Sequence, residues 1–295
     1  MSDSPTARHA ATGSPTDPVA AVERIQTVMH ERFGTHVPVP AHENLGFVEQ
    51  LASRRVRRAY SPDPVSAELI ELLCACALSA PSKSDLQQRD IIVVDDPALR
   101  ATIAGWLPHM PWVEAAPALL IFCANPRRVQ QVSALRDKPF PNNHMDLFFN
   151  AIGDAAIALA TCLHAAESLG LGACPISEIR NRVTELDQLL GLPDQVVPFA
   201  GLCLGWPVAE EQISPRLPLP LTVHRNRFDE GALLAILPDY DRRREGLQPY
   251  LRQYQPERWG VAPEYGWSEQ KARQYAVPQR LDFGAYIRAK GFVLE

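Results

Sequence analysis

The sequence predicts a layered fold in which helices cover both faces of a sheet. Three continuous apolar runs rich in branched residues are typical of strands buried on both faces, and they cover residues 91–94, 119–123 and 196–204. Around them, apolar residues recur three and four positions apart, as on helices that pack against a core. The passage 150–207 holds a helix, a glycine break, a second helix and a strand without interruption.

The composition is that of an ordinary globular protein. The chain has 295 residues, of which 46% are hydrophobic and 21% charged, enough for one large core or two small ones. The most apolar stretch, 115–124, is shorter than the roughly 20 residues that a bilayer crossing needs and contains Pro117, so we expect no membrane partner. A net charge of -5 without a basic block disfavours a nucleic-acid partner.

The cysteine and histidine patterns predict no metal or redox site. Six cysteines stand in apolar contexts, which predicts reduced core thiols in a cytoplasmic protein: Cys74, Cys76, Cys123, Cys162, Cys174 and Cys203. The first two are two positions apart and would point in different directions on a helix. His164 and Glu167 have no second such pair elsewhere in the sequence, which favours a polar pair over half a metal site.

The N-terminal region is predicted to be a tail followed by helices. Residues 1–17 are rich in Ser, Thr, Pro and Ala, lack apolar periodicity and are expected to be disordered. Residues 18–44 are expected to form a helical extension, because apolar residues at helical spacing begin there and stop by Gly34. Amphipathic helices are expected at 45–54 and 66–80.

Glycines mark the ends of the two helices before the last buried strand. The first helix is thin because it is rich in alanine: Ala155, Ala156, Ala158, Ala160, Ala165 and Ala166. Gly170 and Gly172 stand where it needs a left-handed residue to end, and Gly191 marks the same stop in the second helix. Later the composition shifts to Pro, Arg, Tyr and Trp, with weak helices at 268–275 and 283–289.

Four arginines stand within five positions where the chain leaves the helix at 45–54: Arg54, Arg55, Arg57 and Arg58. Like charges this close repel each other unless anions or carboxylates lie nearby. A phosphate is a natural guest, because a guanidinium holds it with two parallel hydrogen bonds. Taken alone, the segment also fits a solvated basic face.

Three short motifs in the passage 150–207 carry a family resemblance. They are SLGLG at the end of the first helix, LGLP after the second helix, and the strand GLCLGWP. With these motifs the passage closely resembles the nitroreductase family of flavin mononucleotide (FMN) enzymes. PRLP at 215–218 and Val223-His224 make it most similar to the NADPH-linked branch of oxygen-insensitive nitroreductases and flavin reductases.

The resemblance spans about residues 45–228 and implies an architecture. This is an α+β fold, a nitroreductase-like three-layer α/β/α sandwich with a mainly antiparallel central sheet, in an intertwined homodimer with two flavin sites at the interface. Residues 45–228 would be the FMN-binding core, and residues 229–295 a C-terminal arm packing on the core or on the partner subunit. The thin alanine-rich helix suits the centre of such a dimer.

In the arginine segment the family carries His-Arg-Ser-x-Arg-x-Phe/Tyr, and Arg55, Arg58 and Tyr60 match it. Arg54 stands where His or Arg is usual, and Val56 replaces a serine that donates its hydroxyl to the phosphate. A lost hydrogen bond is worth about 0.5 to 1.5 kcal/mol, so weaker FMN retention is expected. Arg58 is expected to face the substrate or the nicotinamide nucleotide.

The polar loop before the first strand is similar to the family's Ala-Pro-Ser-x-x-Asn-x-Gln, whose Ser, Asn and Gln touch the flavin ring and ribityl chain. Ser82 and Gln87 match this pattern. Asp85 replaces the amide with an acid, which would disfavour an anionic reduced ring. Lys83 is the cation expected to neutralise it.

A third flavin-binding element is implied after the glycine break. The family approaches the hydride-accepting edge of the flavin there with backbone amides, and Ile176, Ser177 and Glu178 occupy these positions. Ser177 and Glu178 stand where the branch commonly has glycines, so their side chains would crowd the approach.

The remaining site residues lie nearer the C-terminus. Ser214-Pro215-Arg216 is similar to a Lys-Pro-Arg phosphate clamp in which Ser214 has replaced the lysine, so one positive charge is lost. Arg252 and Arg258 are candidates for the extra phosphate of NADPH, with a solvated surface as the alternative.

The implied function is that of an FMN-dependent NADPH oxidoreductase that reduces nitroaromatics, quinones or free flavin by two-electron ping-pong hydride transfer. Because FMN carries the chemistry, no catalytic acid or base is expected from the protein. A specialised flavin dehydrogenase, oxidase or reductive dehalogenase on the same scaffold is one alternative. A non-catalytic flavin-binding or flavin-free member is another, because Val56, Asp85 and Ser214 depart from the family pattern. The sequence specifies neither the physiological acceptor nor the choice between NADPH and NADH.

Overall fold

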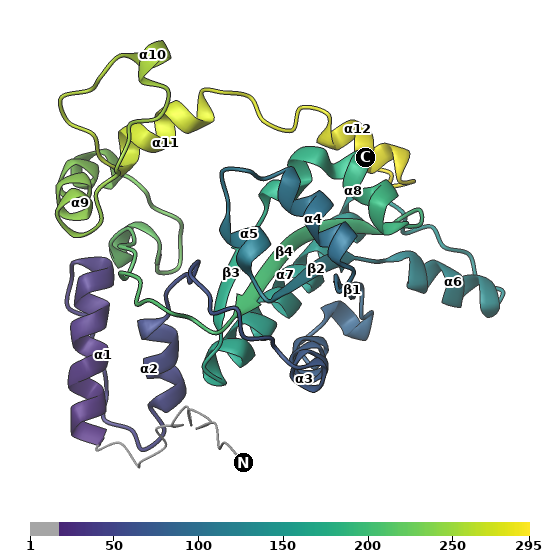
Figure 1. Cartoon of the computed structure of the whole chain (residues 1–295), viewed down its shortest axis with the longest axis horizontal. Helices are drawn as coiled ribbons and strands as arrows, with labels where there is room; N and C mark the ends of the chain where they lie inside the picture. The colour runs from purple at the N-terminus through teal and green to yellow at the C-terminus, as the bar shows by residue number, and fades with distance from the viewer. Residues whose placement is uncertain (1–17) are drawn as a thin grey trace, which may run out of the picture. The chain divides into compact units, whose positions relative to one another are not determined.

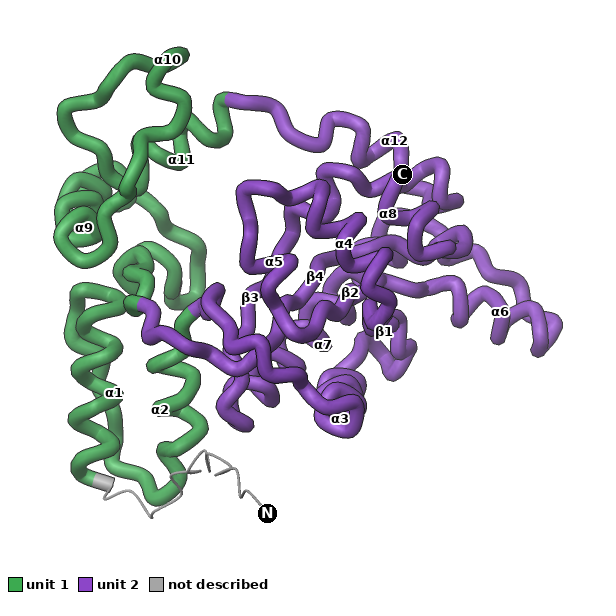
Figure 2. The backbone as a smooth tube through the Cα atoms, in the orientation of Figure 1, with its two compact units in different colours: residues 1–55, 212–276 green, residues 56–211, 277–295 purple. Residues whose placement is uncertain are grey.

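The computed structural model describes residues 18–295, so the expected tail at 1–17 lies outside the described residues (Figure 1). The chain divides into two compact units, coloured separately in Figure 2. Unit 1 comprises residues 1–55 and 212–276, and unit 2 comprises residues 56–211 and 277–295. These boundaries differ from those expected from the sequence, and one of them falls inside the arginine segment.

Unit 2 is built on a four-stranded sheet in the order β1-β2-β4-β3, and every neighbouring pair is antiparallel. The strands are β1 Arg89–Val93, β2 Ala118–Ala124, β3 Gly172–Ile176 and β4 Val197–Gly205. The three predicted strands are confirmed. Sequence analysis missed β3, a short strand that contains Pro175 and pairs only with β4. An edge strand tolerates proline because one side of its backbone needs no ladder partner.

Helices cover both faces of this sheet. Helices α3 Ala67–Leu78 and α7 Met145–Ser168 share one hydrophobic cluster with it, while α4 Pro97–Gly105, α5 Trp112–Ala115 and α8 Val183–Leu190 share the other. Alternate residues of β2 divide between the clusters, with Leu120 on the first side and Ile121 on the second. The predicted three-layer α+β sandwich with an antiparallel sheet is therefore confirmed.

Helix α7 is, among the described residues, the one helix long and apolar enough to cross a membrane. Its length and composition are weak evidence for a membrane span, because the core helix of a soluble protein has the same properties. Its inner face, which includes Asp154, Ala158 and Ala166, is buried against the sheet and α3. The apolar stretch 115–124 is largely strand β2.

The end of the chain returns to unit 2. Helix α12 Phe283–Ala289 and the residues after it bury Tyr286, Ile287 and Phe292 beside β4 and α7. Lys290 donates to both carboxylate oxygens of Asp187, at 2.9 and 3.1 Å. Unit 2 also contains the helix α6 Arg127–Leu135 and the short helices η1 Lys83–Asp85 and η2 Glu178–Arg182.

Unit 1 contains the N-terminal helices and most of the expected arm. Helices α1 Pro18–Phe33 and α2 Gly46–Ser53 bury Ile25 and Ala52 against each other. The arm contributes η3 Leu219–Leu221, α9 Leu233–Leu247, α10 Pro256–Trp259 and α11 Trp267–Tyr275. The helices predicted at 268–275 and 283–289 are confirmed, whereas α9 was missed because Pro238 interrupts its pattern.

The glycine predictions divide into two outcomes. Gly34, Gly170 and Gly191 have φ values of +70°, +85° and +62°, as expected at helix ends. Gly172 was predicted wrongly, because it begins strand β3 and has no left-handed φ. A Cβ at Gly172 would lie 2.7 Å from Cβ of Arg57, so the close approach of that segment requires the glycine.

Candidate functional site

The C-terminus of α1 brings Arg32 to the arginine segment, a contact that sequence analysis missed. The Arg32 guanidinium donates to the carbonyl of Ala52 at 2.9 Å, of Arg54 at 2.7 Å and of Ser214 at 3.3 Å. The backbone N–H of Arg216 in turn donates to the Arg32 carbonyl at 2.6 Å. Unit 1 therefore joins three separate chain segments around the Arg32 guanidinium. The residue Arg32 is only 8% exposed.

Arg32, Arg54, Arg55 and Arg216 form a strongly positive arginine cluster. Burial lowers the pKa of Arg32 to about 10, and the charges of Arg216, Arg54 and Arg55 contribute in that order. Nε of Arg55 is buried and has no hydrogen-bond partner among the described residues. A buried donor next to several guanidinium groups fits a phosphate, which would supply both the missing acceptor and the opposite charge.

A cavity of about 710 Å³ opens at the cluster within unit 1. Its lining includes five cationic side chains and no Asp or Glu: Arg32, Arg54, Arg216, Arg244 and Lys271. Phe33, Tyr240, Tyr250 and Trp267 add aromatic surface. Burial, followed by the charge of Arg244, lowers the pKa of Lys271. The cavity has the size and composition of a site for an anionic small molecule with an aromatic part.

The continuation of the arginine segment, residues 56–61, packs within unit 2. The N–H of Arg57 donates to the carbonyl of Ala173 in β3 at 3.3 Å, and Tyr60 pairs with Pro207 in an isolated bridge. Val56 and Tyr60 pack on the core cluster that includes α4 and α5. Val56 thus has a packing role at the position where the family pattern has serine.

Arg58 is an exposed residue of this segment. Its guanidinium lies over the Trp112 ring, 5.2 Å from the ring centroid. Burial raises the pKa of the neighbouring Tyr60 phenol, which donates to the Arg57 carbonyl at 2.6 Å. Arg58 is therefore supported from below by an aromatic side chain and faces outward, as a substrate-facing group requires.

The loop that carries Ser82, Asp85 and Gln87 has an unusual backbone. Ser84, Asp85 and Gln87 have φ values of +49°, +55° and +52°, in the region that side chains disfavour. Such strain persists only where surrounding contacts fix the backbone, and it is concentrated at functional sites. One of these contacts is internal, since Oγ of Ser82 accepts from the N–H of Gln87 at 2.7 Å.

Asp154 of α7 fixes both ends of this loop. Its two carboxylate oxygens accept from the N–H of Lys83 at 2.8 Å and from the N–H of Gln88 at 3.1 Å. Asp154 is 2% exposed, and sequence analysis did not single it out. An acid at an inward position of an alanine-rich helix was the available signal, because a buried carboxylate needs fixed donors.

The expected neutralisation of Asp85 by Lys83 is absent from the structure. Nζ of Lys83 donates to Oγ of Ser84 at 2.9 Å, whereas Asp85 accepts from Nε2 of Gln87 at 3.2 Å. Ser84 and Asp85 both have positive φ values, which explains why the side chains of Lys83 and Asp85 diverge. The carboxylate is paired with the amide that the pattern assigns to the flavin.

Ile176, Ser177 and Glu178 follow the edge strand β3. Ile176 is buried and Ser177 is exposed, while Oε1 of Glu178 lies 2.8 Å from Nε2 of His109. His109 lies just before α5 and Trp112 is its first residue, so the start of α5 contacts both Glu178 and Arg58. The structure thus brings these two predicted site elements to one side of unit 2.

The loop with Ser82 and the segment with Ser177 are not brought together in one chain. The loop leads into β1 and the segment leaves β3, and these strands are the two outer strands of the sheet. Three strand spacings separate them, which is about 14 Å. A ligand contacting both elements therefore needs either a long reach or a second copy of the chain.

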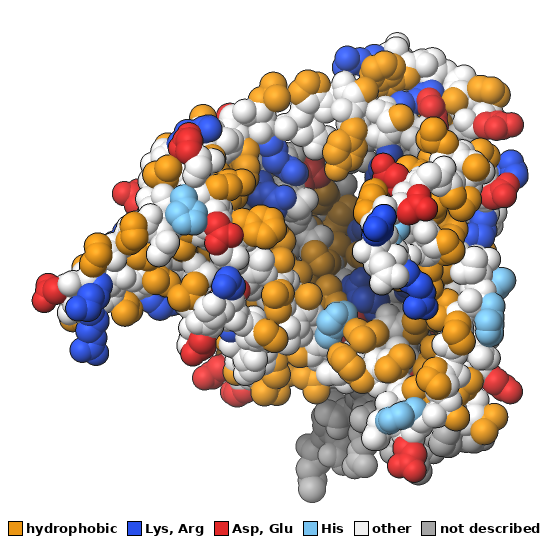
Figure 3. All heavy atoms as spheres, turned by 180° about the vertical axis from the view of Figure 1, so that it is seen from behind, with side chains coloured by type: hydrophobic (Ala, Val, Ile, Leu, Met, Phe, Trp, Pro, Cys, Tyr) orange, Lys and Arg blue, Asp and Glu red, His pale blue; other side chains and the backbone are white. Residues whose placement is uncertain are grey.

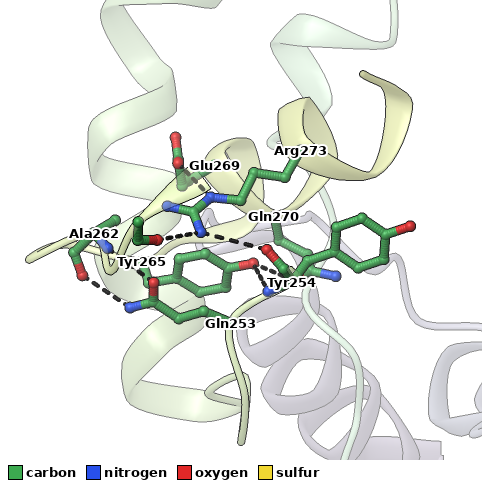
Figure 4. A network of polar contacts seen from close by, with 8 residues as sticks. Gln253, Tyr254, Ala262, Tyr265, Glu269, Gln270 and Arg273 are labelled. Atoms are coloured by element: carbon green, nitrogen blue, oxygen red, sulfur yellow. Dashed lines mark hydrogen bonds and ion pairs between the residues drawn. The ribbon is translucent and has the colours of Figure 1, made fainter. Parts of the chain in front are cut away.

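Arg252 and Arg258 are exposed on a loop of unit 1. Figure 4 shows the network of polar contacts that fixes this loop. Arg273 is 5% exposed, lies over the Tyr265 ring at 5.1 Å and donates to the carbonyl of Gly260 at 2.8 Å. The amide of Gln253 exchanges two hydrogen bonds of 2.8 Å with the backbone of Ala262. The network holds the loop, and leaves Arg258 stacked only on Trp259, 4.8 Å from the ring centroid.

Other charged groups do not form a metal site in the part of the chain that the structure describes. The six cysteines all lie within the described residues and form no disulfide, and four are buried and two half-buried. His164 and Glu167 approach to 4.0 Å as a polar pair. On the face shown in Figure 3, basic and acidic side chains are interspersed with hydrophobic ones.

Comparisons with known proteins agree with this architecture. The model of the nitroreductase family matches residues 51–206, and that of the nitroreductase family C-terminal domain matches residues 214–295. The chain is 32% identical to the FMN reductase (NAD(P)H) of Bacillus subtilis, covering 84% of this chain and 98% of the relative. It is 32% identical to the oxygen-insensitive NADPH nitroreductase of Salmonella typhimurium, covering 83% and 97%.

A solved structure gives the same result. The structure of B. megaterium NfrA2 has 30% sequence identity and a TM-score of 0.76, and the match covers 84% of this chain and 98% of that one. The two family matches together include both the sheet of unit 2 and the arm of unit 1. With the fold, the strained loop and the arginine cluster, these similarities show that the chain belongs to the nitroreductase family.

Proposed function

We propose that the protein is an FMN-dependent oxidoreductase that takes electrons from NADPH and reduces planar acceptors such as nitroaromatics, quinones or free flavin. The observation that carries this proposal is the phosphate-compatible arginine cluster in a chain that matches the nitroreductase family through residues 51–206 and 214–295. Curated relatives named as an FMN reductase and an NADPH nitroreductase support it.

The arginine cluster would hold the phosphate of FMN. Arg54, Arg55 and Arg216 supply positive charge, and Nε of Arg55 supplies a buried donor that needs an acceptor. Bound FMN would supply two-electron hydride chemistry, so the protein need only bind, orient and exclude competing reactions. Val56 contributes packing in place of a hydroxyl, which is why retention depends more on the arginines.

The loop before β1 and the segment after β3 would orient the flavin and the acceptor. Ser82, Asp85 and Gln87 stand on a loop held from Asp154, so their polar groups are fixed before a ligand arrives. Ile176, Ser177 and Glu178 would present backbone amides at the other element of the site. Arg58, exposed over Trp112, would face the acceptor or the nicotinamide nucleotide.

We also propose an intertwined homodimer, which the placement of these elements supports. The loop with Ser82 and the segment with Ser177 lie at the two outer strands of one sheet, so two copies would let both contact one flavin. The outer face of α7 supports this, because Met145, Phe149 and Ile157 repeat along it and are 46%, 68% and 43% exposed. Apolar residues repeating on one face of a helix are typical of a helix that packs against a partner.

The arm would serve NADPH. Arg252 and Arg258 are exposed on the loop that Arg273 and Tyr265 fix, so each has a guanidinium available for the additional phosphate. In this proposal residues 45–228 form the FMN-binding core and residues 229–295 the arm. Six cysteines without a disulfide among the described residues are consistent with a reducing compartment, so we propose a cytoplasmic location.

An absorbance spectrum of the purified protein, followed by anaerobic addition of NADPH, tests the proposal. We expect flavin bands that bleach on mixing and return when a quinone or nitroaromatic is added. NADH in place of NADPH measures the nucleotide preference, and Arg252→Ala with Arg258→Ala should raise KM for NADPH without the same change for NADH.

Two other outcomes would point elsewhere. Bound flavin that stays oxidised with both nucleotides would reject the NADPH reductase and leave a specialised dehydrogenase or oxidase. A colourless protein that takes up no added FMN would reject catalysis altogether and leave a flavin-free family member. Each outcome is visible without knowing the physiological acceptor.

A further inference from the structure

Helix α1 lies before the first residue that matches the family, which is residue 51. Its C-terminus is nevertheless locked to segments that do match. The guanidinium of Arg243 donates to the carbonyl of Glu31 at 2.8 Å, and the N–H of Arg216 donates to the carbonyl of Arg32 at 2.6 Å. The end of α1 is thus held beside the predicted phosphate clamp by contacts to its last carbonyls.

The partners of Arg32 leave its charge uncompensated. All of its hydrogen bonds go to backbone carbonyls, those of Ala52, Arg54 and Ser214, and the described residues offer it no carboxylate. Arg32 is 8% exposed, so water screens its charge poorly. A buried cation among other cations is costly, and an anion in the adjoining cavity would remove that cost.

The position of Arg32 coincides with a charge lost from the clamp. Where the resembling family pattern has Lys-Pro-Arg, this chain has Ser214, Pro215 and Arg216. Nη1 of Arg32 lies 3.3 Å from the carbonyl oxygen of Ser214, and both residues line the same cavity within unit 1. A guanidinium from α1 therefore stands next to the backbone from which a lysine would otherwise extend.

We propose that Arg32, carried by the extra helix α1, is a phosphate-site residue of this protein and replaces the cationic group lost at Ser214. The proposal rests on the proposed FMN-dependent function and adds a ligand contact from outside the family match. It also gives the extension a role: α1 carries a positive charge to the clamp, and its hydrogen bonds hold the segments of Arg54 and Arg216 in register.

Equilibrium binding separates phosphate recognition from general stability. FMN and riboflavin share the ring and the ribityl chain, and they differ by the phosphate. Arg32→Gln keeps a hydrogen-bonding side chain and removes the charge, so we expect Kd for FMN to rise by about tenfold or more while Kd for riboflavin stays unchanged. Flavin fluorescence quenching by the apoprotein measures both constants, and increasing salt should reduce the difference between them.

A second variant tests whether a lysine at position 214 restores the FMN affinity that Arg32→Gln loses. Adding Ser214→Lys to Arg32→Gln restores a cation at the clamp, so the double variant should regain most of the FMN affinity. Arg24→Gln is the matched control, since Arg24 also lies on α1 and pairs with Glu49 on the surface. We expect this control to bind FMN as the unchanged protein does.

The outcomes distinguish this proposal from the proposed function. Equal losses of FMN and riboflavin in Arg32→Gln, without rescue by Ser214→Lys, would show that Arg32 only stabilises the fold and would overturn the inference. Unchanged FMN binding in a folded Arg32→Gln variant would overturn it too. If the unchanged protein binds no FMN, the proposed function itself fails.

Discussion

At the scale of single residues, the surroundings decide what an arginine does. Arg89 is 5% exposed and uses one nitrogen for the carbonyls of Leu78 and Ala80, which fastens the end of α3. Arg58 is exposed above an indole ring and stays free for a ligand. Arg32 is buried like Arg89 but lines a cavity with other cations. Burial alone therefore does not mark a candidate phosphate site, whereas burial with convergent positive charge supports the phosphate site proposed at Arg32.

The buried thiols make a prediction about pH. Burial raises the pKa of Cys123 and of Cys162 to about 12, above the usual value near 9. Between these values the unfolded thiol ionises and the folded one does not, so the free energy of unfolding falls as pH rises from about 9 to 12, by about 1.4 kcal/mol per pH unit for each thiol.

Urea unfolding at a series of pH values measures this slope. Cys162→Ala removes one of these titrating thiols, so its slope between about pH 9 and 12 should be shallower by about 1.4 kcal/mol per pH unit, whatever the variant loses at neutral pH. Parallel curves for the variant and the unchanged protein above pH 9 would contradict the raised pKa of Cys162.

At the scale of elements, the loop before β1 and helix α7 form one functional unit. Three residues with positive φ cost on the order of 1–3 kcal/mol each, and Asp154 together with Arg128 and Ser82 holds the backbone against that cost. The carbonyl of Gln87 accepts from Arg128 at 2.6 Å. Loop geometry in this family member is therefore set from inside the core.

Asp154→Asn tests this unit. An asparagine keeps one acceptor and places an N–H group against a backbone donor, so one buried N–H loses its partner at a cost of about 1–3 kcal/mol. We expect a lower urea midpoint and weaker flavin binding. Asp146→Asn on the same helix is the control, because Asp146 is exposed and accepts a hydrogen bond from the side chain of Asn150. Equal effects of the two substitutions would argue against an anchoring role.

A second element prediction concerns the end of α1. Gly34 has φ of +70°, and a Cβ there would lie 2.6 Å from Nε of Arg243. Gly34→Ala therefore adds left-handed strain of about 1–2 kcal/mol and also displaces Arg243 from the carbonyls of Glu31 and Arg32. We expect it to lower the thermal midpoint further than Gly170→Ala.

Gly170 supplies the comparison because it has φ of +85° with open space around its Cβ position. Its alanine variant should show the strain without the displacement. Thermal unfolding by circular dichroism measures both variants, and a smaller effect at Gly34 than at Gly170 would show that Arg243 is not needed to hold α1.

At the scale of the whole molecule, the proposed dimer explains why helix α7 has large apolar side chains on its outer face. Phe149 is the most exposed of these on α7, and Gly153 beside it meets no atom within 4 Å of its Cβ position. A second copy would cover this face and join the two outer-strand elements of the site. Assembly and cofactor binding should then be coupled.

Phe149→Asp with Ile157→Lys tests the assembly. Charges on the outer face of α7 should convert a dimer into monomers at micromolar concentration, as measured by light scattering, and flavin binding should fall with it. Leu135→Asp on α6 is the control, since Leu135 is 76% exposed and lies outside this face. A monomer in the unchanged protein would count against the interfacial site itself.

Local patterns in the sequence were sufficient for much of the fold. The three branched apolar runs identified β1, β2 and β4, because burial on both faces leaves a continuous apolar signal. Strand β3 escaped notice because its five residues include Gly172 and Pro175, which weaken a strand signal in isolation. The family motifs located the candidate flavin residues in order along the chain.

The sequence by itself determined the layered α+β fold and the family membership that the motifs indicated, because these follow from local periodicity and short patterns. Only the tertiary structure decided that Arg32 meets Ser214, 182 positions away, and that Asp154 holds a loop 71 positions away. Such contacts depend on how the elements pack, and nothing in the neighbouring sequence of either partner specifies the other. The arginine cluster gains its buried charge from that packing.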